Sequence, residues 1–593
     1  MDTKELETFL KKNRMIGEEE TYQGVCKRIF GAITRESEKY DVGEKQIGEM
    51  EATLIDMFKQ RKFVPSTPII TNAGRYEERP LTACSVPPLD ARMNRNELEK
   101  MVNQYHKKGM GTGFNFDDAV DPVTELLFFN ANAVAEFERK EMDRPIGNMG
   151  ILSIDHPQVL NFAGIKAGKF RNHDWKFNIS VNLKDDFMKA LALGEQYKLK
   201  DGTIVNPEKL LDDIVAHAHN CGDPGLVFLD RFEQYNITPH LGKYVSLAPC
   251  GEVPMASGET CQFSYVNLGA FVDGNAVDYE GLKDAVHKMV LMLDNALDIS
   301  ISNFENEKST EIMSRKRKIG VGVCGFSDML FSLGIQYDSE EARGIAEDVM
   351  SLVNYESKKA SVELAKERGA FPAFHDTETK RELITERYLG NSSNTVSSKD
   401  WEQLRDDINQ YGIRHVSTIA LPPTGRSSMV IGASASIEPA FSLANNESLD
   451  GNLERHAREN NYNGNMLSVY VEIDRTGSVQ ETDLPQEVKD IYKTCLELSP
   501  EAHLLMVATF QKYTDDSISK TINLPNNATA DEIKKTYVDS YELGLKGITV
   551  YRDGCKQEQP KALKYNVGVS KWVTIIKEIN LFSLKVWMEQ EKA

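Results

Sequence analysis

This chain of 593 residues has few cysteines and tryptophans, and its basic residues are outnumbered by acidic ones. There are 8 cysteines and 4 tryptophans, and 70 lysines and arginines stand against 90 aspartates and glutamates, which gives a formal net charge of −20. A body this acidic repels polyanions, so sequence-independent binding of nucleic acid is disfavoured. A small phosphorylated ligand remains compatible with this charge, because a local pocket can oppose the sign of the whole molecule.

The cysteines show no CxxC spacing, which disfavours a zinc ribbon or a thioredoxin-type motif, and we expect no metal bound by side chains of the chain. No apolar run reaches the roughly 18 residues that a membrane span needs. The start of the chain, MDTKELETFLKK, is charged and helix-like and does not resemble a signal peptide. We therefore expect a cytoplasmic protein with mostly reduced thiols and no membrane partner.

Length and composition favour one large globular unit. A typical domain length would divide the chain into about four units, but α/β barrels often run this large as one piece. The content of 40% hydrophobic and 27% charged residues is ordinary for a globular protein. Short β-rich runs alternate with amphipathic segments, which favours parallel βα units in one barrel or sheet. The predicted strands are 178–183, 226–229, 319–323, 416–421, 467–473 and 548–551, and the clearest predicted helices are 282–297 and 340–368.

The two ends of the chain differ from this middle. Residues 1–62 carry apolar stripes at three-to-four spacing and predict a helical N-terminal region. Residues 557–593 include Trp572 and Trp587 and read as an apolar tail, which we expect to dock on the body or to pair with another chain. The predicted organisation is a helical region at 1–62, a main domain at 63–556 and an atypical tail at 557–593.

Three stretches rich in glycine or proline lie near predicted strand ends. KKGMGTGFNF (107–116) and RKIGVGVCGF (317–326) have the spacing of neither a dinucleotide fingerprint nor a P-loop, so we interpret them as tight turns. LPPTGRSS (421–428) follows a β-branched run and could open a helix, whose free N–H groups would seat a phosphate. An ordinary capped turn explains the same residues equally well.

Cys250 lies in a loop bracketed by prolines, LAPCGEVPM (247–255). Gly251 permits a bend that could bring Cys250 and Glu252 to the same side of the chain. A neighbouring carboxylate disfavours a thiolate, which argues against a cysteine-protease mechanism. A thiol that stays protonated suits hydrogen-atom chemistry, in which it becomes a thiyl radical while Glu252 manages a proton on the substrate.

Two further cysteines have surroundings that resemble each other. Cys84 lies in PLTACSVPP and Cys261 in GETCQFSYVNLG, each beside a short apolar, strand-like stretch. If the two met in space they would form a dithiol able to supply two electrons, but the sequence alone does not place them together.

The order of eleven motifs along the chain carries a resemblance to a known family. The motifs are PSTPIITNAG (65–74), LTACSV (81–86), GTGFNFD (111–117), MGILSIDHPQVLNF (149–162), FNISVNL (177–183), GDPGLVFLDR (222–231), PCGEVP (249–254), RKIGVGVCGFSDML (317–330), PPTGRSSMVIGASASIEPAF (422–441), SISKTINLP (517–525) and GITVYRDG (547–554). Together they resemble the large chain of ribonucleotide reductase, and most closely the adenosylcobalamin-dependent class II. They extend over nearly the whole chain.

The resemblance implies a ten-stranded α/β barrel made of two five-stranded parallel halves, with a finger loop inside it. It implies that Cys250 forms the thiyl radical that takes the 3′-hydrogen of a ribonucleotide, and that Glu252 is the general base on the 3′-hydroxyl. Cys84 and Cys261 match the pair that is oxidised to a disulfide as the 2′-hydroxyl leaves as water. The residues implied to bind the substrate are Ser66, Thr67, Ala83, Thr424, Gly425, Arg426, Ser427 and Ser428.

The resemblance also implies a cofactor and partners. The region that carries a tyrosine pair in class I reads GITVYRDG here, and no class III glycyl-radical loop is visible, so adenosylcobalamin is the expected radical source. The substrate would be a ribonucleotide di- or triphosphate, and the reductant a thioredoxin-like protein or a small dithiol. A deoxynucleotide effector is expected near MDRPIGNMG (142–150), on a monomer or homodimer.

Three features depart from the family pattern. Ala248 stands where the finger loop usually has Asn, and losing the hydrogen bond of that amide would cost roughly 1–3 kcal/mol, or about ten- to a hundred-fold in rate. Arg426 stands where the family usually has Thr. Cys555 is the only late cysteine in place of a C-terminal pair, so a reductant reaches the site directly, another chain supplies the shuttle, or the chain is truncated.

Two alternatives to a reductase stay open. The departures are compatible with a diverged radical enzyme that acts on a nucleotide without completing the standard reduction. A non-catalytic nucleotide-binding protein is the other alternative. Retention of all four reactive residues argues against it, because drift would be expected to lose at least one of them.

Overall fold

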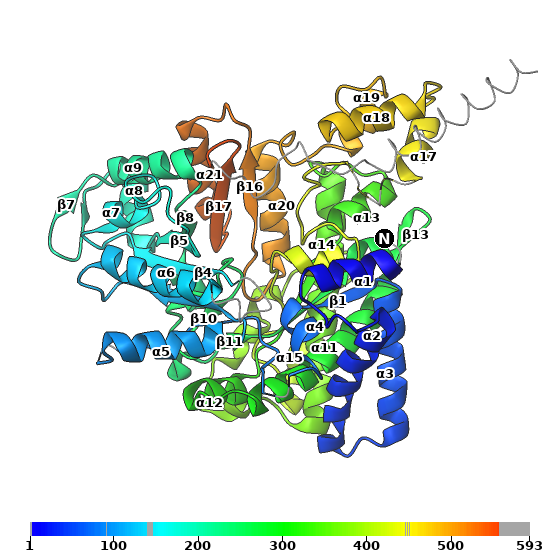
Figure 1. Cartoon of the computed structure of the whole chain (residues 1–593), viewed down its shortest axis with the longest axis horizontal. Coiled ribbons are helices and arrows are strands. Elements are labelled where there is room, and N and C mark those ends of the chain that lie inside the picture. The colour runs from blue at the N-terminus through cyan, green and yellow to red at the C-terminus, as the bar shows by residue number, and fades with distance from the viewer. Residues whose placement is uncertain are drawn as a thin grey trace, which may run out of the picture.

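The computed structural model describes residues 3–556, except 77, 91, 139–145, 445, 447, 448 and 450. Two sheets hold the centre, and helices surround them (Figure 1). The predicted tail at 557–593 and the first four residues of the predicted effector stretch at 142–150 lie outside the described residues. None of the described helices is both long and apolar enough to cross a membrane.

The larger sheet has 8 strands in the order β11-β2-β3-β4-β5-β8-β17-β16. Strands β2, β3, β4, β5 and β8 are mutually parallel neighbours, β17 joins β8 antiparallel, and β16 lies parallel to β17. The strands are β2 (Cys84–Ser85), β3 (Gly111–Asn115), β4 (Asn148–Ser153), β5 (Phe177–Asn182), β8 (Gly225–Val227), β11 (Thr260–Cys261), β16 (Thr521–Leu524) and β17 (Gly547–Arg552). The helices of this region are α5 (Arg95–His106), α6 (Pro122–Glu138), α7 (Val159–Ala163), α8 (Asp185–Leu193), α9 (Pro207–Cys221), α10 (Leu229–Gln234), α20 (Pro500–Lys512) and α21 (Ala530–Glu542).

The smaller sheet has 3 strands, in the order β1-β12-β15, with β12 and β15 parallel. Beyond β15 the pairing continues as two isolated parallel bridges, from Val321 to Ile419 and from Leu421 to Ile518. The strands are β1 (Phe63–Pro65), β12 (Phe263–Asn267) and β15 (Gly320–Cys324), and the helices are α4 (Thr67–Asn72), α11 (Tyr279–Ser302), α12 (Glu307–Lys316), α13 (Phe326–Leu333), α14 (Glu340–Arg368), α15 (Ser398–Tyr411) and α16 (Gly425–Val430). The two hairpins β6 (Tyr197–Lys198) with β7 (Ile204–Val205), and β13 (Val272–Asp273) with β14 (Ala276–Val277), are peripheral.

Two groups of helices flank the sheets. The predicted N-terminal helices are present as α1 (Thr3–Lys12), α2 (Tyr22–Arg35), η1 (Glu36–Tyr40) and α3 (Glu44–Lys59), and their buried residues join the main hydrophobic core. A second, smaller core gathers around α17 (Asn452–Glu459), α18 (Met466–Thr476) and α19 (Gln486–Ile491), which Figure 1 shows apart from the sheets at the upper right.

Most of the predicted elements are confirmed. The predictions at 178–183, 226–229, 319–323 and 548–551 correspond to β5, β8, β15 and β17, while 416–421 makes only the two isolated bridges. The helices predicted at 282–297 and 340–368 are α11 and α14. The ten strands of the predicted barrel do not all appear as named strands, so the described architecture is an α/β body with a helical N-terminal region.

One prediction is wrong, and another is borne out only in part. The strand predicted at 467–473 is part of α18, because Asn465 caps the helix start, Gly477 ends it in a left-handed conformation, and the buried residues recur at helical spacing. The stretches 107–116 and 317–326, interpreted as tight turns, are turns only at one end, at Gly109 and Gly325, and the rest forms the strands β3 and β15. A Cβ at Gly113 would collide with the Leu247 carbonyl oxygen, and one at Gly320 with the ring of Phe263.

Candidate active site

A short hairpin inside the body carries Cys250, and we call residues 246–255 the finger hairpin. Its strands β9 (Ser246–Leu247) and β10 (Pro254–Met255) pair antiparallel. Gly251 has φ +81, a left-handed conformation that favours glycine, so the predicted bend is confirmed. The structure describes all eight cysteines, and Cys250 is the exposed one among them. The hairpin therefore presents one accessible thiol at its tip.

Two glycines of β3 make room for the finger hairpin. A Cβ at Gly113 would lie 2.1 Å from the carbonyl oxygen of Leu247, and a Cβ at Gly111 would lie 2.8 Å from Cγ of Pro249. Both separations are shorter than van der Waals contact, so a larger residue at either position would push the hairpin away. The glycines of the GTGFNF motif thus set how closely the hairpin approaches the sheet.

Cys84 and Cys261 face each other across β2 and β11. They are register partners, both are buried free thiols, and the Cys261 thiol donates to the Cys84 carbonyl over 3.6 Å. Burial, followed by the contact with Cys84 and the charge of Glu252, raises the pKa of the Cys261 thiol well above its usual range. The structure therefore brings the two predicted thiols together and keeps Cys261 protonated.

The dithiol and the finger hairpin border the same glycine. A Cβ at Gly111 would lie 3.4 Å from Sγ of Cys84, on top of its close approach to the hairpin. Glu252 is 3% exposed, and its backbone carbonyl accepts a hydrogen bond from the Ser517 N–H over 2.9 Å. Since the Glu252 charge acts on the Cys261 thiol, its carboxyl group lies within electrostatic range of the dithiol. The four predicted catalytic residues thus gather in one place.

The two segments predicted to bind phosphate meet at the starts of α4 and α16. Oγ1 of Thr67 lies 3.3 Å from Oγ of Ser427, although the two are 360 residues apart. Ser66 precedes α4 as its N-cap residue, and its buried hydroxyl makes no hydrogen bond to the described part of the chain. Hydroxyl groups from two distant segments therefore converge at two helix starts.

The other predicted hydroxyl ligands are already used inside their own loop. Thr424 is left-handed, with φ +55, and its Oγ1 accepts a hydrogen bond from the Ser436 N–H over 2.9 Å. The Ser428 hydroxyl donates to the Gly425 carbonyl over 3.1 Å. These bonds fix the shape of the turn that opens α16.

Ala83 and Arg426 occupy different surroundings. The Ala83 N–H donates to the Cys261 carbonyl over 3.1 Å, so this residue lies directly beside the dithiol. The Arg426 guanidinium donates to the carbonyl of Asn13 and also lies 3.4 Å from its Oδ1. Arg426 therefore ties the predicted phosphate loop to the segment that follows α1.

Sequence reasoning missed two residues that contact the finger hairpin. Nδ2 of Asn178 donates to the Pro249 carbonyl over 2.9 Å, and Nζ of Lys318 donates to the Pro254 carbonyl over 3.0 Å. Both lie in motifs that carry the family resemblance, FNISVNL and RKIGVGVCGFSDML. The motifs could have drawn attention to them, but no local pattern indicates which hairpin atom each one meets.

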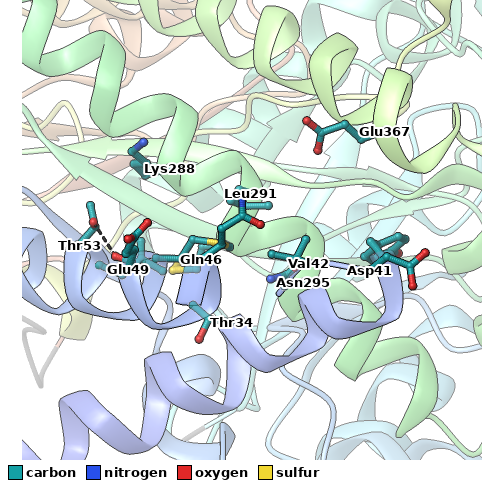
Figure 2. Close-up of a pocket in the computed structure, with 14 residues that line it drawn as sticks. Thr34, Asp41, Val42, Gln46, Glu49, Thr53, Lys288, Leu291, Asn295 and Glu367 are labelled. Carbon is teal, nitrogen blue, oxygen red and sulfur yellow. Dashed lines mark hydrogen bonds between the residues drawn. The ribbon is translucent and has the colours of Figure 1, made fainter. Parts of the chain in front are cut away.

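A cavity of about 610 Å³ lies elsewhere, between the N-terminal helices and α11 (Figure 2). The buried polar groups in its wall already have partners: Oγ1 of Thr34 donates to the Phe30 carbonyl, and Nδ2 of Asn295 donates to Ser37. Its charged lining residues are Asp41, Glu49, Glu367 and Lys288. None of the predicted site residues lines this cavity, so we place the candidate reaction at the finger hairpin.

Comparison with known proteins identifies the family. Residues 98–551 match the family described as ribonucleotide reductase, barrel domain. A vitamin B12-dependent ribonucleoside-diphosphate reductase of Mycobacterium tuberculosis (strain CDC 1551 / Oshkosh) is 31% identical over 564 residues, which cover 90% of this chain and 76% of that protein. The chain belongs to the vitamin B12-dependent ribonucleotide reductases.

Two further comparisons show how far the similarity of this chain to known reductases extends. The vitamin B12-dependent ribonucleoside-diphosphate reductase of Thermoplasma acidophilum is 34% identical over 533 residues, covering 84% of this chain but only 64% of that protein's own length. The class Id ribonucleotide reductase alpha subunit of Actinobacillus ureae superposes with a TM-score of 0.73 at 20% identity, covering 93% of this chain and 97% of that one. This second likeness shows the shared fold.

Proposed function

We propose that this chain reduces ribonucleotides to 2′-deoxyribonucleotides by thiyl-radical chemistry at Cys250. The observation that carries the proposal is that the finger hairpin, which holds two chemically distinct groups, lies beside the dithiol: Gly111 borders both Pro249 and Cys84, and the charge of Glu252 acts on Cys261. The hairpin holds an exposed thiol at its tip and the buried carboxyl group of Glu252, and the dithiol is the reduced pair of Cys84 and Cys261. A radical site, a base and a two-electron donor are the three parts that this reduction needs.

The strand pairings support a closed ten-stranded barrel. Strands β2, β3, β4, β5 and β8 would form one parallel half. The other half would comprise β12, β15, the segment 416–421, β16 with the bridge at Ile518, and β17. The antiparallel contacts between β8 and β17, and between β2 and β11 just before β12, would close the ring. In this interpretation the finger hairpin fills the interior, since it contacts β3 from within.

The radical source would be adenosylcobalamin, as the names of the relatives indicate. When bound, it supplies a carbon-centred radical by homolysis of its cobalt–carbon bond. The chain fits such a source because Cys250 is exposed, whereas the other seven cysteines are buried. Asn178, which is exposed and bonded to the residue before Cys250, would border the bound adenosyl group.

The reduction would then proceed on residues of this chain. The Cys250 thiyl takes the 3′-hydrogen of the ribose while Glu252 accepts the proton of the 3′-hydroxyl. The 2′-hydroxyl leaves as water with a proton from the dithiol, and Cys84 and Cys261 supply two electrons and become a disulfide. Cys250 finally returns its hydrogen to C3′. The overall change is one ribonucleotide and two thiols to one deoxyribonucleotide, one water and one disulfide.

Substrate phosphates would bind at the paired starts of α4 and α16. The unengaged buried hydroxyl of Ser66 and the hydroxyls of Thr67 and Ser427 support this placement, since they lie at the starts of two helices that meet there. Thr424, Gly425 and Ser428 would shape that loop. Ala83 would line the site beside the dithiol, and Arg426 would hold the loop from its outer side.

A thioredoxin-like protein or small dithiol would re-reduce the disulfide. A deoxynucleotide would act as effector on a monomer or homodimer.

A diverged radical enzyme is the second candidate, and Ala248 is the observation that favours it. This residue is buried on the finger hairpin and carries only a methyl group, so position 248 offers no amide to a substrate hydroxyl. The preserved arrangement of the other four residues favours reduction over divergence, and it also argues against a protein that only binds nucleotides.

The test combines an activity assay with three cysteine variants. The chain is incubated with adenosylcobalamin, dithiothreitol and each ribonucleotide, and deoxyribonucleotide formation is measured together with hydrogen exchange between cofactor and solvent. Cys250→Ser should abolish both signals, because a serine O–H bond is too strong to yield its hydrogen to a carbon radical. Cys84→Ser and Cys261→Ser should retain the exchange and lose clean reduction.

Cys324→Ser is the matched control, since Cys324 is a buried thiol on β15 outside the proposed site. It should keep both signals. Identical behaviour of the three site variants would refute the division of roles. Efficient reduction with a di-iron partner protein and no cobalamin would refute the choice of cofactor.

A further inference from the structure

A buried group of charges lies at the base of the finger hairpin, on the side away from β3. Lys318 precedes β15, and its Nζ lies 3.0 Å from a carboxylate oxygen of Glu259 and 3.7 Å from one of Asp516. All three side chains are almost completely buried. Charges withdrawn from water in this way are stable only when they are paired and hydrogen-bonded, so the group has a fixed geometry.

Each member of the group is connected to the finger hairpin, either directly or through a neighbouring residue. Nζ of Lys318 donates to the Pro254 carbonyl over 3.0 Å. Oε2 of Glu259 accepts a hydrogen bond from the Ala256 N–H over 2.8 Å. Asp516 is followed in the chain by Ser517, the residue whose N–H holds the Glu252 carbonyl.

The connection through Asp516 and Ser517 reaches Glu252 itself. The backbone of Glu252 is held from Ser517, and the adjoining Asp516 is held by Lys318, which itself grips the hairpin two residues beyond Glu252. A single ammonium group therefore links the hairpin, close to Glu252, to the segment that supports Glu252. Loss of that group would remove the hydrogen bond to Pro254 and the ion pair with Asp516 at once.

We propose that Lys318 is a positioning residue that fixes the Glu252 carboxyl group relative to the dithiol. The proposal rests on the proposed function, in which Glu252 is the base. Lys318 does not touch the reacting atoms; it acts through the hairpin backbone and through Asp516. Its removal should therefore slow the chemical step without weakening substrate binding.

Lys316 provides a matched control. It pairs with the same carboxylate, at 2.8 Å from Glu259, it is equally buried, and its ammonium group lies over the same ring of Tyr244 as that of Lys318. Among the described contacts, however, its ammonium group makes no hydrogen bond to the finger hairpin. The two lysines therefore share Glu259 and Tyr244 as neighbours, and they differ in the contacts of Lys318 with Pro254 and Asp516.

The first measurement needs neither substrate nor cofactor. Amide hydrogen exchange of the peptide 244–256 is followed in the intact chain for Lys318→Met, Lys318→Arg and Lys316→Met. Lys318→Met should speed exchange at the hairpin amides by at least about ten-fold, because their opening becomes easier. Lys316→Met should leave it within about threefold, and Lys318→Arg should lie between the two because it keeps the charge and a donor.

The second measurement is steady-state reduction. Lys318→Met should lower kcat by about 10- to 100-fold while KM stays within about twofold, and Lys316→Met should change kcat by less than about threefold. Equal effects of the two methionine variants, or unchanged exchange in Lys318→Met, would overturn the proposal. If Lys318→Met does not fold, Asp516→Asn decides by the same comparison.

The two measurements keep the proposals separate. If the unaltered chain reduces no ribonucleotide, the proposed function fails, and the exchange data still decide whether Lys318 positions the hairpin. If the chain is active and the exchange data are negative, the positioning role alone fails.

Discussion

The finger hairpin is held by two kinds of contact on its two sides. On one side, β3 offers Gly111 and Gly113, whose missing side chains let the hairpin backbone approach. On the other side, Lys318, Glu259 and Asp516 present full charges in a buried setting. The glycine side sets how closely the hairpin backbone approaches the sheet, whereas the charged side holds the hairpin through the ammonium group of Lys318. A loop can thus be held in place both by the absence of side chains on one neighbour and by paired charges on another.

The largest effect is expected on the glycine side, from Gly113→Ala. The added Cβ would lie 2.1 Å from the Leu247 carbonyl oxygen, and a backbone atom cannot rotate away, so the hairpin must move. Displacing a catalytic group by about 1 Å costs on the order of a hundred-fold in rate. We expect kcat to fall by about that factor, measured by reduction of a ribonucleotide alongside thermal unfolding.

Gly150→Ala is the control for this variant. Gly150 lies on the neighbouring strand β4, and a Cβ there would meet the ring of Phe116 at 3.0 Å instead of the hairpin. It should lower Tm and leave kcat within about threefold. An equal loss of kcat in both variants would attribute the effect to general destabilisation.

A smaller effect, of opposite sign, is expected at the hairpin itself from Ala248→Asn. An amide at this position would share the substrate hydroxyls with Glu252 and hold the ribose so that its 3′-hydrogen faces Cys250. Part of the roughly ten- to hundred-fold loss attributed to alanine should be recovered in kcat/KM. Because Ala248 is fully buried, Tm is measured alongside kcat/KM on each ribonucleotide. A folded variant with no gain on any ribonucleotide would favour the diverged enzyme.

The smallest expected effect is a change in folding stability with pH, caused by His106. Burial lowers the pKa of His106 from 6.5 to about 4, and its Nε2 is bonded to Thr112 and Asn148 without a charged partner. Since the folded pKa lies below the unfolded one, the unfolded chain binds more protons, and stability falls as pH drops from about 6.5 towards 4. Between pH 7.5 and 5 this residue should account for a loss of about 2 kcal/mol.

His106→Gln tests that dependence. The variant should be less stable than the unaltered chain at pH 7.5 by about 1 kcal/mol, through weaker hydrogen bonds, and should lose less stability on acidification. Denaturant unfolding at the two pH values gives both quantities. An unchanged slope would assign the acid sensitivity to other buried histidines, such as His415, which is paired with Asp294.

The sequence by itself determined the chemistry of the candidate site and much of its scaffold. The order of the motifs pointed to the family that the comparisons confirm, and the Cys-Gly-Glu loop indicated a bend that the positive φ of Gly251 bears out. Helix α14 could be bounded from the sequence because its apolar spacing and caps are local signals. The strand predicted at 467–473 failed because β-branched residues within one helical turn resemble a strand until the caps are considered.

The tertiary structure alone decided which residues meet. The contact of Thr67 with Ser427 spans 360 residues, and the pairing of Cys84 with Cys261 depends on the register of two short strands. Sequence patterns also gave no sign that Gly113 makes room for a carbonyl oxygen or that Lys318 supports Glu252. The physical reason is that local patterns fix the conformation of a segment, whereas distances between segments follow from how the whole core packs.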